Sequence, residues 1–169
     1  MKQFIDRHVL IENKGYTLIE VLVVISIMAI LFTVGYAGYR EFSRRQVLIG
    51  AVNQVQGDLR KAQQLALSGV KPNDPKCNSP ELLNGYIFVI DSSGTAYSIQ
   101  SSCTGGNVQS EDLVNLPLGI SISISSGPLM FKVIGSGTNI SNEDTVLTVS
   151  QGATGDSRTI TIGSGGDIK

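Results

Sequence analysis

The chain opens with a short polar segment and then changes abruptly to an apolar block. Residues 1–15 form a leader of mixed charge that ends in Lys14 and Gly15. Residues 16–39 contain a single charged side chain, Glu20. Because a helix of about 20 apolar residues spans a bilayer, this pattern predicts a membrane-length helix over residues 16–39.

Helical periodicity continues beyond the apolar block, in a more polar setting. Apolar side chains recur at steps of three or four along residues 40–68, which places them on one helix face. They are Leu48, Ala51, Val55, Leu59, Ala62 and either Leu65 or Ala66. Proline is absent between Tyr16 and Ser68, and Gly69 is a suitable C-terminal stop. We therefore expect residues 40–68 to extend the first helix as an amphipathic continuation.

From residue 69 onward the hydrophobic period changes to two. Residues 85–90 and 96–100 flank a glycine-containing turn, which predicts a hairpin. Isoleucine alternates with serine over residues 120–125, as in a strand with one buried face. Further strands are expected at 129–134, 145–149 and 158–162, with a short one beginning at Asp167. The predicted fold class is α+β: a long N-terminal helix whose amphipathic half packs on an antiparallel β-sheet domain at residues 69–169.

Charge and residue content argue against several functions. From Val70 onward the chain has five Lys and Arg against nine Asp and Glu, a balance of −4, whereas a domain that grips phosphates is usually basic. Nucleic acid is therefore an improbable partner. The only histidine, His8, precedes Gly15, and no catalytic constellation, metal pattern or cofactor motif is found. For the acidic pairs at 111–112 and 143–144, surface charge is favoured over a weak calcium site.

The junction between leader and apolar block carries the most specific motif. It reads Lys14-Gly-Tyr-Thr-Leu-Ile-Glu20 and is followed directly by the apolar run. This resembles the signal of type IV prepilins and type II secretion pseudopilins, in which a glycine ends the leader and a glutamate lies five residues after the cut. Tyr16 stands where phenylalanine is usual. The resemblance implies cleavage after Gly15 by a prepilin peptidase, methylation of the new amine of Tyr16, and a pilin-like fold.

The same resemblance gives Glu20 a role in assembly. A carboxylate in a bilayer helix is unfavourable by about 3 kcal/mol, so such residues often mark function. In the resembling proteins the glutamate pairs with the amine of a neighbouring subunit. Three alternatives stay open: Glu20 reaches back to the membrane surface, the chain is an uncleaved anchor, or an ordinary signal is cut after Ala37.

Two looser features accompany the motif. Residues 58–66, with Asp58, Ala62 and Ala66, and the C-terminal residues 158–168 resemble the H-type minor pseudopilins and their FimT-like relatives. Export of the domain also favours one disulfide between Cys77 and Cys103, with two free thiols as the alternative.

The predicted function is that of a structural subunit rather than an enzyme. We expect a single-pass protein of the inner membrane with an extracytoplasmic β-domain. Its partners would be the prepilin peptidase and other pilin or pseudopilin subunits, and it would assemble into a type II secretion pseudopilus or a type IV pilus. The alternatives are a minor pilin for DNA uptake and a plain membrane-anchored β-domain.

Overall fold

The computed structural model of the chain describes residues 15–141 and 144–169. The predicted leader before Gly15 and Glu143 of the second acidic pair therefore lie outside the described residues. The chain divides after Arg40 into two compact units, and the second is Glu41–Lys169.

One α-helix, α1 (Leu18–Ser68), contains both the apolar block and its amphipathic continuation. Its C-terminus is closed by Gly69, whose φ of +63° lies in the left-handed region that suits glycine. The backbone N–H of Gly69 donates to the carbonyl oxygens of Leu65 and Ala66, at 3.1 and 3.3 Å. The predicted helix is confirmed, with its start two residues later than expected.

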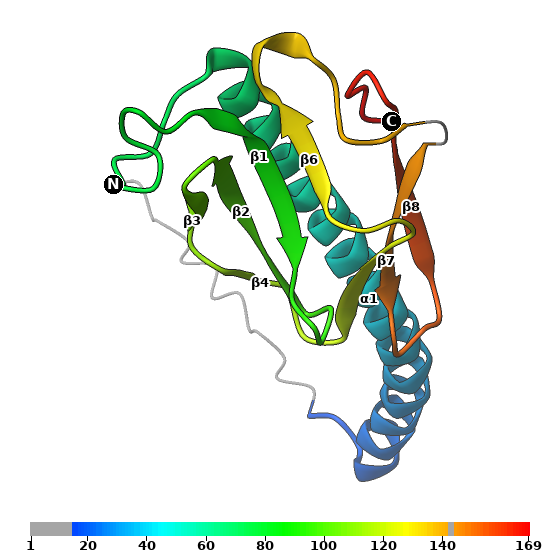
Figure 1. Cartoon of the computed structure of the whole chain (residues 1–169). Coiled ribbons are helices and arrows are strands. Elements are labelled where there is room, and N and C mark those ends of the chain that lie inside the picture. The colour runs from blue at the N-terminus through cyan, green and yellow to red at the C-terminus, as the bar shows by residue number, and fades with distance from the viewer. Residues whose placement is uncertain (1–14, 142–143) are drawn as a thin grey trace, which may run out of the picture. The chain divides into compact units, whose positions relative to one another are not determined.

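The larger of two antiparallel sheets is built around a three-strand meander (Figure 1). Its strands are β1 (Leu83–Ile90), β2 (Ala96–Cys103), β3 (Gly106–Gln109), β4 (Val114–Asn115) and β6 (Leu129–Lys132). The order is β3-β2-β1-β6, and β4 pairs with the start of β2. The predicted hairpin is the β1–β2 pair, with Ile90 opposite Tyr97.

The turn of this hairpin is organised by Asp91. Its carboxylate accepts hydrogen bonds from the Ser93 hydroxyl, at 2.5 Å, and from the backbone N–H groups of Ser93, Thr95 and Ala96. The Ser93 hydroxyl first, and the Ala96 N–H second, lower the pKa of Asp91 to about 2. The turn thus holds Asp91 in its charged form over most of the pH range.

The second sheet has three strands in the order β5-β7-β8. They are β5 (Ile120–Ile124), β7 (Thr145–Gln151) and β8 (Ser157–Ile162). The predicted isoleucine alternation is confirmed: Ile120 and Ile122 are buried, whereas Ser121 and Ser123 are not. The last residues do not form a named strand, but Ile168 bridges to Ile162 at the end of β8.

The strand predicted over 129–134 is wrong at its C-terminal end. β6 stops at Lys132, and Val133–Gly135 forms a 3₁₀ turn in which Ile134 adopts a φ of +57°. A β-branched residue with a left-handed backbone conformation is an outlier, and no sequence pattern predicts it. The short strands β3 and β4 were also not predicted, and the strands form two sheets where the sequence suggested one.

The hydrophobic core of the second unit lies between α1 and the sheets. The predicted stripe on α1 is confirmed, with Ala66 rather than Leu65 as its fully buried last member. On the larger sheet, the rings of Phe88 and Tyr97 stack with their centres 4.8 Å apart. Both rings are almost completely buried, so they anchor the sheet against the helix.

Candidate functional site

The start of α1 carries a local capping arrangement. Thr17 immediately precedes the helix, and its side-chain oxygen accepts the backbone N–H of Glu20 at 3.3 Å. The Thr17 carbonyl accepts the N–H of Val21 at 3.2 Å. Thr17 and Glu20 have the spacing of a capping box, and a carboxylate in the first turn is favoured by the helix dipole. This arrangement fixes where the helix begins relative to Tyr16.

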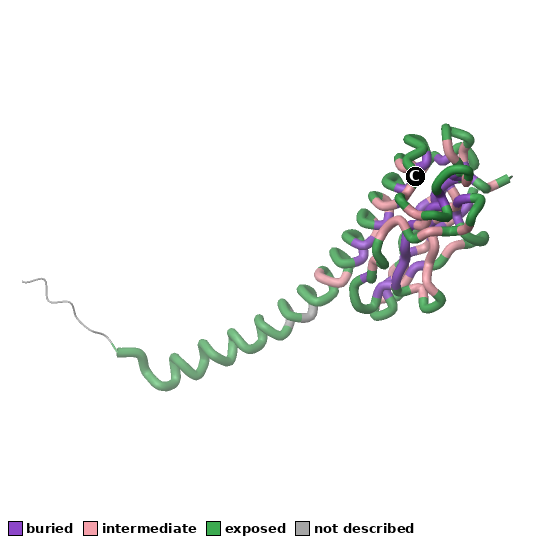
Figure 2. The backbone as a smooth tube through the Cα atoms, turned by 60° about the vertical axis from the view of Figure 1, so that its left-hand side comes forward, coloured by how far each residue is buried: buried purple, intermediate pink, exposed green. Residues whose placement is uncertain are grey.

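The first half of α1 leaves its apolar side chains uncovered. Every residue from 18 to 33 is exposed, and Figure 2 colours this stretch accordingly. Leu31 and Phe32 are 67% and 72% exposed, respectively. A contiguous apolar surface of this extent is a mark of a membrane or protein contact. One helix of the described chain is long and apolar enough to cross a membrane, and this stretch supplies its apolar part.

The end of the apolar block has an interfacial character. The rings of Phe32 and Tyr36 stack with centres 6.1 Å apart, and the guanidinium carbon of Arg40 lies 5.7 Å from the centre of the Tyr36 ring. Tyr39, which precedes Arg40 in the sequence, is also exposed. Aromatic and cationic side chains in this order are typical of the boundary between hydrocarbon and water.

The second half of α1 is held to the domain by polar contacts as well as by the core. The Tyr97 hydroxyl donates to a carboxylate oxygen of Asp58 at 2.6 Å. The Lys61 ammonium pairs with Glu111 at 2.8 Å. Burial first, and the hydrogen bond to Asp58 second, raise the pKa of Tyr97 well above its usual value. Asp58 is thus a structural acceptor for a buried tyrosine.

The cysteines lie in the second unit, away in sequence from the motif. The structure joins Cys77 to Cys103 in a disulfide, and both side chains are buried. The bridge ties the segment after α1 to the end of β2. Nearby, the ammonium of Lys71 donates to the carbonyl of Glu81 at 2.6 Å, and the Thr104 hydroxyl binds the Glu81 carboxylate.

The residues singled out from the sequence therefore fall into two groups. Gly15, Tyr16 and Glu20 are all exposed at the start of α1, whereas the disulfide belongs to the β-domain. Among residues 15–141 and 144–169, no group of three or more His, Cys, Asp or Glu residues is placed so that it could bind a metal ion. The cap at Thr17 was not predicted, although the spacing between Thr17 and Glu20 is the sequence signal of such a cap.

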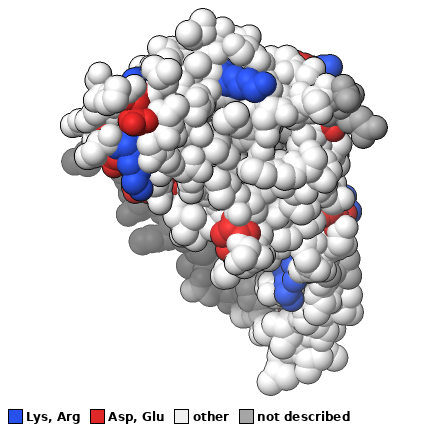
Figure 3. Space-filling model, viewed as in Figure 1, with Lys and Arg blue, Asp and Glu red and all other residues white. Residues whose placement is uncertain are grey.

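Charged side chains are sparse on the face of the molecule shown in Figure 3. Blue and red groups form a few small clusters of mixed sign, and wide uncharged areas separate these clusters. A continuous basic surface of the kind that follows a phosphate backbone is not seen on that face.

Comparison with known proteins bears on the N-terminal segment. Residues 12–36 match the family model described as the prokaryotic N-terminal methylation motif. No curated protein matches the chain, and no solved structure matches it. This motif supports a pilin or pseudopilin that is processed by prepilin peptidase. The match overlaps the part of α1 that is apolar enough to cross a membrane, and it supports a type IV prepilin-like N-terminal segment.

Proposed function

We propose that this chain is a pilin or pseudopilin subunit that is cut after Gly15, methylated at Tyr16 and assembled through residues 16–39 of α1. In this proposal residues 1–15 are the leader and residues 40–68 carry the helix into the β-domain. The mature subunit has 169 − 15 = 154 residues. Its partners are the peptidase and other subunits with the same kind of helix.

One observation carries this proposal. The methylation motif covers residues 12–36, and within that range every residue of the helix from 18 to 33 is exposed. None of these exposed residues belongs to the hydrophobic core of the described chain, whose first member along α1 is Leu48. A helix of this kind is stable in lipid, and it is also stable against other apolar helices. Filament assembly requires the helix to move from lipid into contact with other apolar helices.

Glu20 is the residue that makes assembly specific. It lies in the first turn of α1, where the helix dipole favours a negative charge. In a filament, we infer, its carboxylate pairs with the amine of Tyr16 on a neighbouring subunit. Because an unpaired acid in hydrocarbon is unfavourable, the pairing favours subunits that are in register over subunits alone in lipid.

Two finer assignments belong to the same proposal. We place the chain nearest to the H-type minor pseudopilins. This is supported by the helix end at residues 58–66 and by the pairing of Ile168 with the end of β8. The proposal covers both machines, the type II secretion pseudopilus and the type IV pilus. Co-purification with an identified secretin or retraction apparatus would decide which machine contains it.

Filament incorporation of two variants tests the proposal. Glu20→Ala is expected to be processed normally but to disappear from sheared filaments, because it removes only the charge partner. Thr33→Ala is the matched control: Thr33 is polar and lies in the same block, but its hydroxyl is satisfied by the Ile30 carbonyl at 2.8 Å. It should assemble like the parent. Equal incorporation of both variants would refute the role of Glu20.

A further inference from the structure

A groove lies on the second unit between α1 and the start of β8. Its cavity has a volume of about 220 Å³ and is lined by Arg45, Leu48, Ile49, Asp156, Ser157 and Arg158. Leu48 is buried at its floor, and Ile49 is 41% exposed. We call this the α1–β8 groove. It combines apolar side chains of α1 with charged side chains from both elements.

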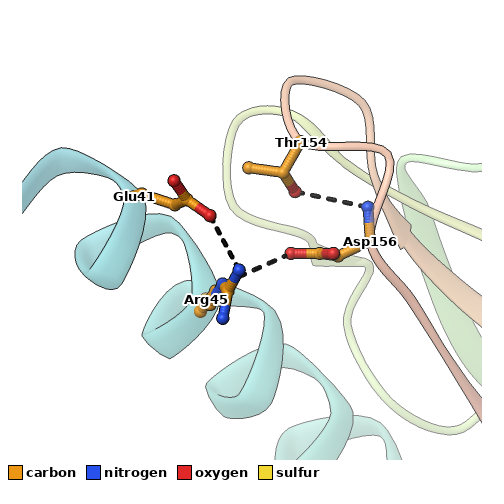
Figure 4. Close-up of polar contacts among 4 residues, drawn as sticks. All are labelled: Glu41, Arg45, Thr154 and Asp156. Carbon is orange, nitrogen blue, oxygen red and sulfur yellow. Dashed lines mark hydrogen bonds and ion pairs between the residues drawn. The ribbon is translucent and has the colours of Figure 1, made fainter. Parts of the chain in front are cut away.

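One rim of the groove has its charges matched within the subunit. The Arg45 guanidinium contacts Glu41 at 2.7 Å and Asp156 at 3.8 Å, as Figure 4 shows. The backbone N–H of Asp156 donates a hydrogen bond to the hydroxyl oxygen of Thr154 at 3.3 Å. Among the described residues Arg158 forms no ion pair, and its side chain is exposed. The groove therefore has one cation available for an acidic partner.

The groove also adjoins an open strand edge. On the side of β8 away from β7, Thr161 exchanges both backbone hydrogen bonds with Lys169, at 3.0 and 2.9 Å. In an antiparallel ladder every second residue faces the same edge, so Ser157 and Thr159 face outward beside Thr161. Within the part of the chain that the structure describes, they have no backbone partner there. Unpaired edges next to apolar surface are usually covered in the assembled protein.

The opposite edge of the domain offers a complementary feature. The loop between β3 and β4 contains Glu111, Asp112 and Leu113, and in Figure 1 these strands lie on the left while β8 lies on the right. Glu111 is paired with Lys61. Asp112 is exposed and forms no ion pair with any described residue, and Leu113 is 51% exposed. An acid next to an exposed leucine matches a groove with one available arginine and an apolar floor.

We propose that the α1–β8 groove of one subunit receives the 111–113 loop of a second copy of this chain, with Asp112 at Arg158 and Leu113 over Ile49. The proposal rests on the proposed function, because it needs subunits side by side. The two surfaces differ, so the contact is heterologous, and repetition of such a contact builds an open helical array rather than a closed pair. An exposed ion pair changes contact affinity by at most about fivefold, so the apolar contact must contribute as well.

Disulfide trapping tests the contact directly in membranes of the native host with its assembly machinery. The variant with Ile49→Cys and Leu113→Cys should give a ladder of cross-linked multimers, since cysteine pairs bridge when their Cα atoms come within about 4.4–6.8 Å. The native cysteines are already paired with each other, so they do not interfere. Each single variant should stay monomeric, and the two singles expressed together should stop at a dimer.

Charge exchange is the second measurement. Asp112→Arg and Arg158→Asp should each reduce filament incorporation severalfold, and the double exchange should restore it. Lys132→Glu, an exposed charge on β6, is the control and should have no effect. Filaments that contain the double-cysteine chain without a cross-link, or a double exchange as defective as the singles, would overturn this contact while leaving the proposed function intact. A cross-link to a different subunit would also overturn it. Absence of the parent chain from any filament would overturn both.

Discussion

The hydrogen bond between Tyr97 and Asp58 should be a main polar support of the β-domain. Tyr97→Phe removes the hydroxyl that donates to Asp58 at 2.6 Å but keeps the ring that stacks on Phe88. A hydrogen bond to a charged group contributes about 1.5–3 kcal/mol. Because Asp58 is only half-buried, we expect a loss of about 2 kcal/mol in the free energy of unfolding.

Urea unfolding of a soluble fragment that begins at Glu41 measures this loss, with circular dichroism as the signal. A double-mutant cycle of Tyr97→Phe and Asp58→Ala should give a coupling energy of about 2 kcal/mol. Tyr86→Phe is the matched control, since the Tyr86 hydroxyl donates to the neutral carbonyl of Val70 at 2.5 Å. That change should lower stability by only about 1 kcal/mol.

Alkaline pH offers an independent readout of the same contact. The pKa of Tyr97 is raised in the folded protein, by burial first and by Asp58 second. Its contribution to stability is therefore complete below the unfolded tyrosine pKa of about 10 and is lost as the pH rises above it. Tyr97→Phe should lose less stability above pH ~10 than the parent, with some loss remaining because burial also raises the pKa of Tyr86. An unchanged urea midpoint together with an unchanged alkaline profile would refute the reasoning.

Three further predictions concern the β-domain, each read from the urea midpoint of the same fragment. Removal of the disulfide by Cys77→Ala and Cys103→Ala, which opens a loop with a sequence separation of 26, should reduce stability by about 3.5 kcal/mol in the chain-entropy model; a loss under about 1 kcal/mol would contradict it. Gly85→Ala should be strongly destabilising because its Cβ would collide with a backbone carbonyl of β6, whereas Gly57→Ala, on open helix surface, should stabilise by up to about 1 kcal/mol; similar effects would argue against the packing. As the pH falls below about 4, the parent should lose stability through the pKa of Asp91 near 2, and Asp91→Asn should lack this component; coincident acid profiles would exclude it.

Local periodicity accounts for what the sequence predicts correctly. The stripe from Leu48 to Ala66 is buried because helical spacing alone places those side chains on one face. The alternation at residues 120–124 works in the same way for a strand. The left-handed Ile134 was missed because β-branched residues carry no preference for that conformation. The short strands β3 and β4 exist only through their pairing with β2.

Long-range partners were beyond the reach of sequence patterns. The acceptor role of Asp58 could not be predicted because it depends on Tyr97, which lies 39 residues away in the sequence. The division of the strands into two sheets likewise depends on tertiary pairing. The junction at Gly15, Tyr16 and Glu20 is a different case: the motif is local, and a family model matches it, but the chemistry assigned to these residues remains a prediction.

The N-terminus of the native chain tests the central claim most directly. Protein extracted from membranes that contain a working prepilin peptidase should be analysed by N-terminal sequencing and intact mass. We predict a chain that begins at Tyr16 with a methylated amine and retains the whole apolar part of α1. A chain that begins at Met1, or after Ala37, would contradict the account.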